Sequence, residues 1–272
     1  MWCQANTGRH HPPFSRQRVK LITPKMVSVA QIASKGSVGR HNLQTGQAMS
    51  KESMGPTRPR DATPLGKKER MMTTRDGDLH VFIDAARAAF CEYAQDTASH
   101  NSLTRIFAAL ERPVPATGQA PKRLPVCAHL ANVAAPENFT DPTLRRLVAA
   151  FASIECRLTW RRRDVSHPSA SANCLDGHAN AMVVGPGGLE QREDVWVGVS
   201  LLAPHVRYPD HWHLPEETYL VMSDGEFSQG GGSWFRPGVG GSFYNKPNIV
   251  HAMRSLKVPL FAFWALTLAI NM

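Results

Sequence analysis

Hydrophobic and polar positions divide the chain into a helix-like stretch and a later strand-like stretch. Over 78–98, apolar side chains recur every three to four positions, which predicts an amphipathic helix. The same spacing over 103–110 predicts a second helix, and Asp141 followed by Pro142 is typical of the start of a third that runs towards Cys156. We expect these helices to form a layer that covers a β domain or mediates a homodimer.

Beyond residue 157 the apolar runs become short, and Gly, Pro, Asp and Asn separate them. The expected strands are 158–162, 178–184, 195–202, 217–222, 226–229, 242–244, 249–254 and 259–268. Short, regularly spaced strands without helices between them are typical of a β-sandwich or barrel. The predicted fold is therefore mainly β, with a helical region over 77–157 packed on a β domain over 158–272.

The positive charge of the chain lies in its leading segment. The formal net charge is +9, but residues 1–76 hold 14 Lys and Arg against 4 Asp and Glu, and residues 77–272 hold 17 against 18. A nucleic-acid-binding domain would carry its basic residues on the folded part, so we exclude that function. We expect the polar leader to be disordered or to reflect an over-extended start, with organelle targeting as the alternative.

Cysteine usage and the longest apolar run indicate a reducing compartment and no membrane span. The 5 cysteines are scattered and never spaced Cys-x-x-Cys, which is typical of free thiols. The longest apolar run, 258–270, is too short to cross a bilayer and contains Pro259, so we interpret it as a buried strand. We therefore expect a cytoplasmic protein.

The densest group of potential ligands lies within residues 207–219. If this stretch is a β-strand, its period of two places four side chains on one face: His211, His213, Glu217 and Tyr219. His251 follows in a second block rich in Gly and Pro. Two histidines alone would be an ordinary polar strand rim, but imidazole, carboxylate and phenolate together predict a divalent metal site. The mixed donors admit iron, zinc, manganese, nickel or cobalt.

Two sequence motifs resemble those of the cupin superfamily. The first is His211-x-His213-x-x-x-Glu217 followed by Gly225, and the second covers 240–251. The resemblance implies a small jelly-roll barrel, the cupin barrel, whose interior holds one metal ion. Because the motifs occur across many activities, they imply a fold and a metal but little chemistry.

The first motif is more specific than this, because it extends to Tyr-x-x-His-x-His-x-x-x-Glu-x-Tyr over 208–219. The longer pattern resembles the cupin-type dimethylsulfoniopropionate (DMSP) lyases, which release acrylate and dimethyl sulfide. The resemblance implies four metal ligands: His213, Glu217, Tyr219 and His251. It places Tyr208 and His211 in the substrate cavity. Lys246 and Asn248 stand where the usual cupin turn has Pro and Gly, so we expect a remodelled loop there.

The implied reaction is a β-elimination that removes the proton next to the substrate carboxylate and expels a neutral sulfide. A divalent metal would stabilise the developing enolate charge, and a tyrosine would act as general base, with Tyr219 as first choice and Tyr208 as second. A sulfonium cation favours an aromatic wall, although aromatic residues are also common in cores. Three aromatic residues near the motifs are candidates for this wall: Trp196, Phe243 and Trp264.

Two alternative functions stay open from sequence alone. One is another metal-dependent cupin enzyme, such as a dioxygenase or an isomerase, and the other is a catalytically inactive cupin binding module. Three further polar groups are given structural roles. Glu216 is expected to face solvent or cap a turn, 161–163 to form a solvated strand end, and His178 to be a satisfied structural histidine.

Overall fold

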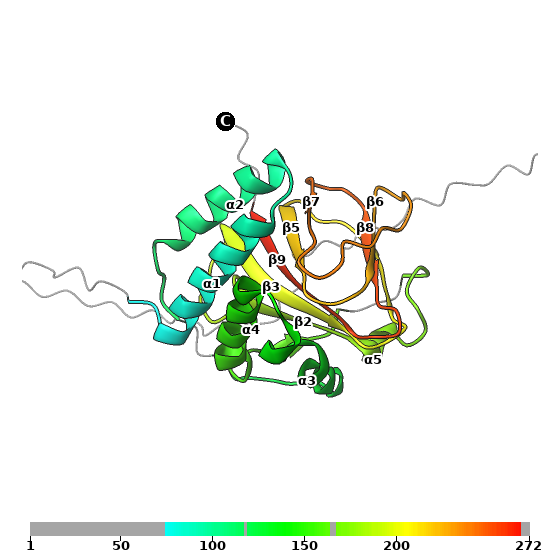
Figure 1. The fold of residues 1–272 in the computed structure, drawn as a ribbon, viewed down its shortest axis with the longest axis horizontal. Helices are drawn as coiled ribbons and strands as arrows, with labels where there is room; N and C mark the ends of the chain where they lie inside the picture. The colour runs from blue at the N-terminus through cyan, green and yellow to red at the C-terminus, as the bar shows by residue number, and fades with distance from the viewer. Residues whose placement is uncertain (1–73, 117–118, 164–166, 268–272) are drawn as a thin grey trace, which may run out of the picture.

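The computed structural model describes residues 74–116, 119–163 and 167–267. The basic leader predicted over 1–76 lies almost entirely outside these residues. Within them, a layer of helices precedes two β-sheets along the chain (Figure 1). Of the helices in this part, none has the length and apolar character that crossing a membrane requires.

The longer helices precede the strands as predicted, but the short helix α5 lies between β1 and β2, where none was expected. The helical segments are α1 (Gly77–Tyr93), α2 (Thr97–Leu110), η2 (Pro125–His129), α3 (Leu130–Val133), η3 (Pro136–Asn138), α4 (Pro142–Glu155) and α5 (Cys174–Gly177). The strands are β1 (Trp160–Arg161), β2 (His178–Val184), β3 (Val195–Leu202), β4 (Arg207–His211), β5 (Glu216–Val221), β6 (Glu226–Gln229), β7 (Ser242–Asn245), β8 (His251–Arg254) and β9 (Leu260–Thr267).

Aspartate side chains set the starts of the longer helices. Asp141 accepts hydrogen bonds from the backbone N–H groups at the start of α4, which confirms the helix start predicted there. The prediction of one helix over 78–98 is wrong, because α1 ends at Tyr93 and α2 begins at Thr97, with Asp96 as its N-cap. The Asp96 carboxylate accepts the Ser99 N–H at 2.9 Å, and this cap competes with continuation of α1.

Two antiparallel sheets build the β domain. The larger has the strand order β1-β2-β3-β9-β5-β7, and the smaller has the order β4-β8-β6. Figure 1 shows α1, α2 and α4 on one side of the larger sheet and β6 and β8 on the other. This mainly β barrel with an N-terminal helical layer confirms the predicted fold class, whereas the domain boundary at residue 157 stays a prediction.

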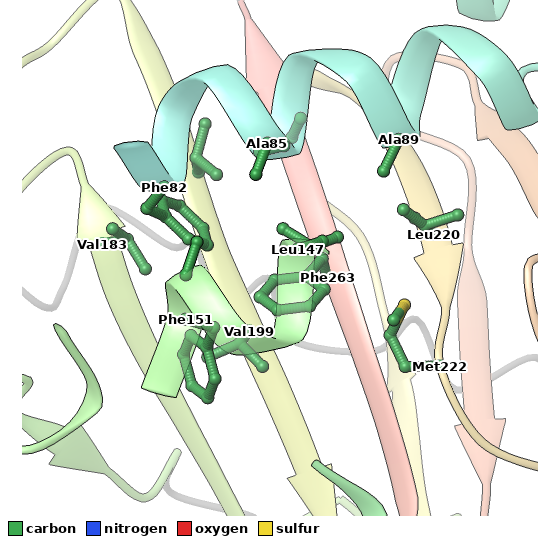
Figure 2. Close-up of a cluster of buried hydrophobic side chains, with 14 of the residues drawn as sticks. Phe82, Ala85, Ala89, Leu147, Phe151, Val183, Val199, Leu220, Met222 and Phe263 are labelled. Atoms are coloured by element: carbon green, nitrogen blue, oxygen red, sulfur yellow. The ribbon is translucent and has the colours of Figure 1, made fainter. Parts of the chain in front are cut away.

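The larger sheet has one face towards the helices and one towards the barrel interior. On the helical face, Phe263 of β9 packs against Phe82 of α1 and Phe151 of α4, with ring centroids 5.9 and 5.3 Å apart (Figure 2). Because side chains alternate along a strand, Trp264 and its cross-strand partner Tyr219 point to the opposite, inner face. Packing against the helices therefore determines which residues reach the interior.

Truncation of Phe151 should destabilise the helical layer strongly. Its side chain is 1% exposed and contacts the rings of Phe82, Phe261 and Phe263. Phe151→Ala should lower the free energy of unfolding by about 3–5 kcal/mol, the usual cost of emptying a buried Phe site. Urea unfolding followed by circular dichroism measures the change. Val81→Ala, at a position 50% exposed on α1, is the matched control, and equal effects of the two substitutions would contradict the packing described.

Glu216 joins the barrel to the helical layer, so the expectation that it faces solvent or caps a turn is wrong. The side chain is buried on β5, forms an ion pair with Arg105 of α2, and accepts a hydrogen bond from the Tyr244 hydroxyl at 2.7 Å. Its neighbour Glu217 points the other way, into the barrel. Alternation separates the two glutamates correctly, but only the position of α2 shows that the outer face is covered.

Removal of the Glu216 carboxylate should affect stability and leave the barrel interior intact. Glu216→Ala leaves the Tyr244 hydroxyl and the Arg105 guanidinium without their acceptor, which should cost about 1–3 kcal/mol of unfolding free energy. Chemical unfolding and metal analysis of the same preparation test both statements. The exposed Glu137→Ala serves as the control. Loss of metal with unchanged stability in Glu216→Ala would contradict this orientation.

Candidate metal centre

Three buried side chains with potential metal-ligand atoms converge inside the barrel. His213 lies in the turn between β4 and β5, Glu217 on β5, and His251 at the first position of β8. One ligand atom from each lies within 4.8 Å of the other two. The fold thus brings together three of the four predicted ligands, and they come from both sheets.

Backbone carbonyl groups orient both imidazole rings of this cluster. His213 Nδ1 lies 2.8 Å from the Pro215 carbonyl oxygen, and His251 Nδ1 lies 2.9 Å from that of Ile249. Because a carbonyl oxygen only accepts, Nδ1 carries the proton of the neutral ring and Nε2 carries the free lone pair. The two Nε2 atoms face Glu217 Oε2 at 3.4 and 3.2 Å. Metal-binding histidines commonly have this orientation.

The Glu217 carboxylate is ionised in this environment. Burial by itself would raise its pKa, but the neighbouring His213, and then His251, hold the pKa well below its usual value. Burial also lowers the pKa of His213, yet the Glu217 carboxylate raises that pKa overall. The cluster therefore attracts a proton between carboxylate and imidazole, and a bound cation would take its place.

These residues fit a divalent transition metal. Nε2 of His251 is buried and has no hydrogen-bond partner among the residues the structure describes, although it lies near the carboxylate. A buried imidazole nitrogen without a partner is unfavourable unless a ligand satisfies it. Two imidazoles and a carboxylate are donor types that iron, zinc, manganese, nickel and cobalt all accept.

Asn245 and Gln229 support Glu217, and sequence analysis does not identify either of them. Asn245 Nδ2 donates to Glu217 Oε2 at 2.9 Å, and Gln229 Nε2 donates to Asn245 Oδ1 at 2.6 Å. Asn245 is the cross-strand partner of Glu217 in the pairing of β5 with β7. Asn245 lies within the second motif, which could have drawn attention to it, but the motif does not show that Asn245 pairs with Glu217 across the sheet.

Residues 207–219 do not form one continuous strand, so the condition under which alternation was applied to them holds only in part. β4 ends at His211 in the smaller sheet, β5 begins at Glu216 in the larger sheet, and the residues between them form a turn. The Asn248 N–H donates to the His213 carbonyl at 2.9 Å and so ties the loop before β8 to this turn. Asn248 has a φ of 62°, a left-handed conformation that Asn adopts more readily than most residues, so it can replace the Gly of the usual cupin turn.

A β-bulge brings Tyr208 and His211 to the same inner face. In a regular strand, residues three apart lie on opposite faces, but the register of β4 against β8 shifts between these two. The ring centroid of His211 lies 5.0 Å from that of Tyr208 and 4.1 Å from that of His251. Burial, and then nearby positive charge, holds the pKa of His211 well below its usual value, so this ring is neutral.

Tyr219 lies on the same face of β5 as Glu217. Its ring stacks on Phe243 with centroids 5.2 Å apart, and Phe243 also packs against Phe227 and Phe235. Burial, and then the charge of Glu217, raises the pKa of Tyr219 well above its usual value.

Trp196 and Trp264 also point to the inner face of the larger sheet. Trp264 is the cross-strand partner of Tyr219 on one side and of Gly198 on the other. A Cβ at Gly198 would lie 2.2 Å from the Trp264 ring, so this glycine makes room for the indole. Trp196 is half-buried and shares its cross-strand partner, Leu266, with Glu217.

Arg163 does not behave as part of the solvated strand end that was predicted. Its backbone N–H donates to His178 Nε2 at 2.9 Å. Burial raises the pKa of the Tyr208 hydroxyl, and the nearby Arg163 guanidinium opposes part of that rise. His178 Nδ1 lies 2.5 Å from the Cys174 carbonyl oxygen. Both nitrogens of His178 are therefore used within the fold, as expected for a structural histidine.

Comparison with known proteins gives a family and a fold. A family model described as dimethylsulfoniopropionate lyase matches residues 98–262, more than half of the chain. No curated protein sequence matches this chain significantly.

Two solved structures share the fold over most of their length. One, described as crystal structures of the DMSP lyases RdDddP and RnDddQII, has 21% identity and a TM-score of 0.55, and the match covers 71% of this chain and 93% of that one. The other is the DMSP lyase DddQ from Ruegeria pomeroyi DSS-3, with 20% identity, a TM-score of 0.55, and 73% and 95% coverage. A cupin-2 domain from Rhodospirillum rubrum matches more distantly, with 8% identity, a TM-score of 0.33, and 42% and 72% coverage.

Proposed function

The chain belongs to the dimethylsulfoniopropionate lyase family and is therefore a lyase, and from this premise we propose a metal-dependent β-elimination that converts DMSP to acrylate and dimethyl sulfide. The observation that carries the proposal is the buried cluster of His213, Glu217 and His251, with Tyr208 and Tyr219 on the same interior. The metal cluster would bind the substrate carboxylate, and a tyrosine in the same interior would remove the proton.

His213, Glu217 and His251 would hold the metal, with Tyr219 as the fourth ligand. When bound, a divalent metal supplies Lewis acidity that stabilises negative charge on the substrate carboxylate as the neighbouring carbon loses its proton. The Nδ1 bonds of the two histidines keep their Nε2 atoms directed inward, and Asn245 holds the Glu217 carboxylate. These contacts give the donors their orientation before any ligand arrives.

A tyrosine oxygen takes the proton from the carbon next to the substrate carboxylate. The electrons of that C–H bond form the new carbon–carbon double bond, and those of the C–S bond leave with dimethyl sulfide. Tyr219 and Tyr208 are both candidates because each is buried on the inner face. His211, neutral and adjacent to His251, lines the same cavity.

Aromatic rings near the cluster suit the sulfonium end of the substrate. Phe243 stacks on Tyr219, and Trp264 is the cross-strand partner of that tyrosine. Trp196 lies in the row of the sheet that also holds Glu217. A soft cation is attracted to such ring faces, so these three side chains are the proposed wall of the substrate site.

The cytoplasmic location and the homodimer stay predictions.

Dimethyl sulfide release tests the proposed function directly. Purified full-length protein, with its metal content measured, is incubated with DMSP, and headspace gas chromatography quantifies the dimethyl sulfide formed. We expect release that scales with metal content and an equal amount of acrylate. Oxygen consumption without dimethyl sulfide would favour a dioxygenase instead, and bound metal with no turnover of DMSP would favour a binding module.

A further inference from the structure

A series of side-chain hydrogen bonds runs from Trp264 on β9, across β3 and β2, to Tyr208 on β4. Trp264 Nε1 donates to Ser200 Oγ at 3.1 Å, Ser200 Oγ donates to Asn180 Oδ1 at 2.6 Å, and Asn180 Nδ2 donates to the Tyr208 hydroxyl oxygen at 3.3 Å. The residues lie on β9, β3, β2 and β4. Neither the metal cluster nor the aromatic wall uses Asn180 or Ser200.

The direction of these bonds follows from the chemistry of the first member. An indole N–H can only donate, so Ser200 accepts from Trp264 and has its own proton free for Asn180. Ser200 Oγ donates this proton to Asn180 Oδ1 at 2.6 Å, a distance typical of O–H···O, so the Asn180 atom beside Ser200 is the carbonyl oxygen. The amide nitrogen of Asn180 therefore faces Tyr208, whose oxygen must accept.

Close packing fixes Trp264 and Ser200, the first two residues of this hydrogen-bond series. The Trp264 ring lies so close to Gly198 that a Cβ there would approach it to 2.2 Å. Ser200 is 2% exposed and is the cross-strand partner of Asn180, which keeps the two side chains adjacent. The orientation of the Asn180 amide is thus set by the sheet and not by solvent.

A positive charge also lies near the Tyr208 hydroxyl. Burial raises the pKa of Tyr208, and the Arg163 guanidinium opposes part of that rise, while the bond from the Arg163 backbone to His178 fixes the start of the arginine side chain. The His178 ring packs edge-on against Tyr208 with centroids 5.0 Å apart. Tyr208 thus lies near a donor and a positive charge, whereas Tyr219 lies beside the anionic Glu217. The two tyrosines have opposite environments.

We infer that Asn180, oriented by Ser200 and Trp264, is a positioning residue that keeps the Tyr208 oxygen an acceptor, ready to take the substrate proton. This inference rests on the proposed function, in which a tyrosine oxygen accepts that proton. The bond from Asn180 to Tyr208 becomes stronger when the tyrosine oxygen carries negative charge, so the Asn180 amide favours the form of Tyr208 that accepts a proton.

A spectroscopic titration tests the inference without any turnover. The chain contains 4 tyrosines, so the ultraviolet difference absorbance that disappears in Tyr208→Phe reports the ionisation of Tyr208. In Asn180→Asp the donor becomes an anion, and this ionisation should move upward by roughly one to two pH units, the equivalent of one hydrogen bond to a charged group. Circular dichroism at each pH confirms that the protein stays folded. An unchanged ionisation would overturn the inference.

Kinetics of dimethyl sulfide release give a second readout. Asn180→Asp should lower kcat roughly ten- to hundred-fold and move the acidic limb of the pH profile to higher pH, with KM and metal content nearly unchanged. Ser200→Ala should give a smaller shift in the same direction, and Ser200→Thr, which keeps the hydroxyl, should restore the wild-type profile. A wild-type kcat and pH profile in Asn180→Asp would refute a positioning role.

The two readouts separate this inference from the proposed function. If wild-type protein releases no dimethyl sulfide, the proposed function fails, while the titration still decides whether Asn180 acts on Tyr208. If wild-type protein is active and Asn180→Asp titrates and turns over like it, only the inference fails. Asn132→Asp, at an exposed position of α3, is the matched control and should change neither readout.

Discussion

Replacing His251 with alanine is expected to remove the bound metal and to lower dimethyl sulfide release by at least about 100-fold, more than the loss of a residue that only supports a ligand. The reason is that His251 provides the buried Nε2 that has no other partner in the described part of the chain and that faces Glu217 at 3.2 Å. Elemental analysis after dialysis and headspace gas chromatography measure the two effects.

His100→Ala is the matched control for this experiment, because His100 is exposed on α2 and away from the barrel interior. It should keep both metal and activity. Addition of metal in excess should restore part of the activity of His251→Ala, since two of the three clustered ligands are still present. Full activity of His251→Ala with no bound metal would contradict the metal-dependent mechanism.

Tyr208→Phe is expected to lower kcat for DMSP by roughly 100- to 10,000-fold, the usual contribution of a general base, with metal content unchanged. The phenol oxygen that accepts from Asn180 is lost, while the ring keeps its edge-on contact with His178. Tyr219→Phe should instead lower metal affinity, because Tyr219 lies next to Glu217 and is the proposed fourth ligand. Kinetics and metal titrations on both variants separate the two roles.

Tyr93→Phe, which lies on α1, controls for the loss of a phenol elsewhere and should leave turnover unchanged. The opposite pattern is equally informative. If Tyr219→Phe abolishes turnover while holding its metal, and Tyr208→Phe remains active, then Tyr219 is the base and the first choice from sequence is correct.

Much of the β domain could be predicted from local pattern. The strands predicted over 178–184, 195–202 and 226–229 match β2, β3 and β6 residue for residue. Their bounds are set by turn residues on either side, and turn chemistry is a local property of the chain. Opposite orientations of Glu216 and Glu217 also follow from alternation alone.

The residues of the candidate site could be predicted from the sequence, but the strand break and the β-bulge that position them could not. The family resemblance implied His213, Glu217 and His251 as ligands, and in the structure their potential ligand atoms lie within 4.8 Å of one another. The route differs, because a turn separates β4 from β5 and a bulge in β4 turns Tyr208 inward. Breaks and bulges depend on which strand pairs with which, and that pairing joins residues far apart in the sequence.

The residues that sequence analysis assigned to solvent or omitted share one property. Arg163, Asn180, Asn245 and Glu216 all act through partners on other elements. A single polar residue on a strand carries no local mark of its distant partner, so its role appears only when the sheets and the helical layer are assembled.

By itself the sequence determined the order of helices and strands, the alternation that sends Glu217 and Tyr219 to one face, and the residues at 208–219 and 251 that can bind a metal. Those features depend on short-range stereochemistry and on side-chain chemistry. The tertiary structure alone decided that the candidate metal ligands converge inside the barrel, that Glu216 forms an ion pair with a helix, and that Tyr208 accepts a hydrogen bond from the Asn180 amide. These contacts depend on the packing of elements distant in the chain, which no local pattern specifies.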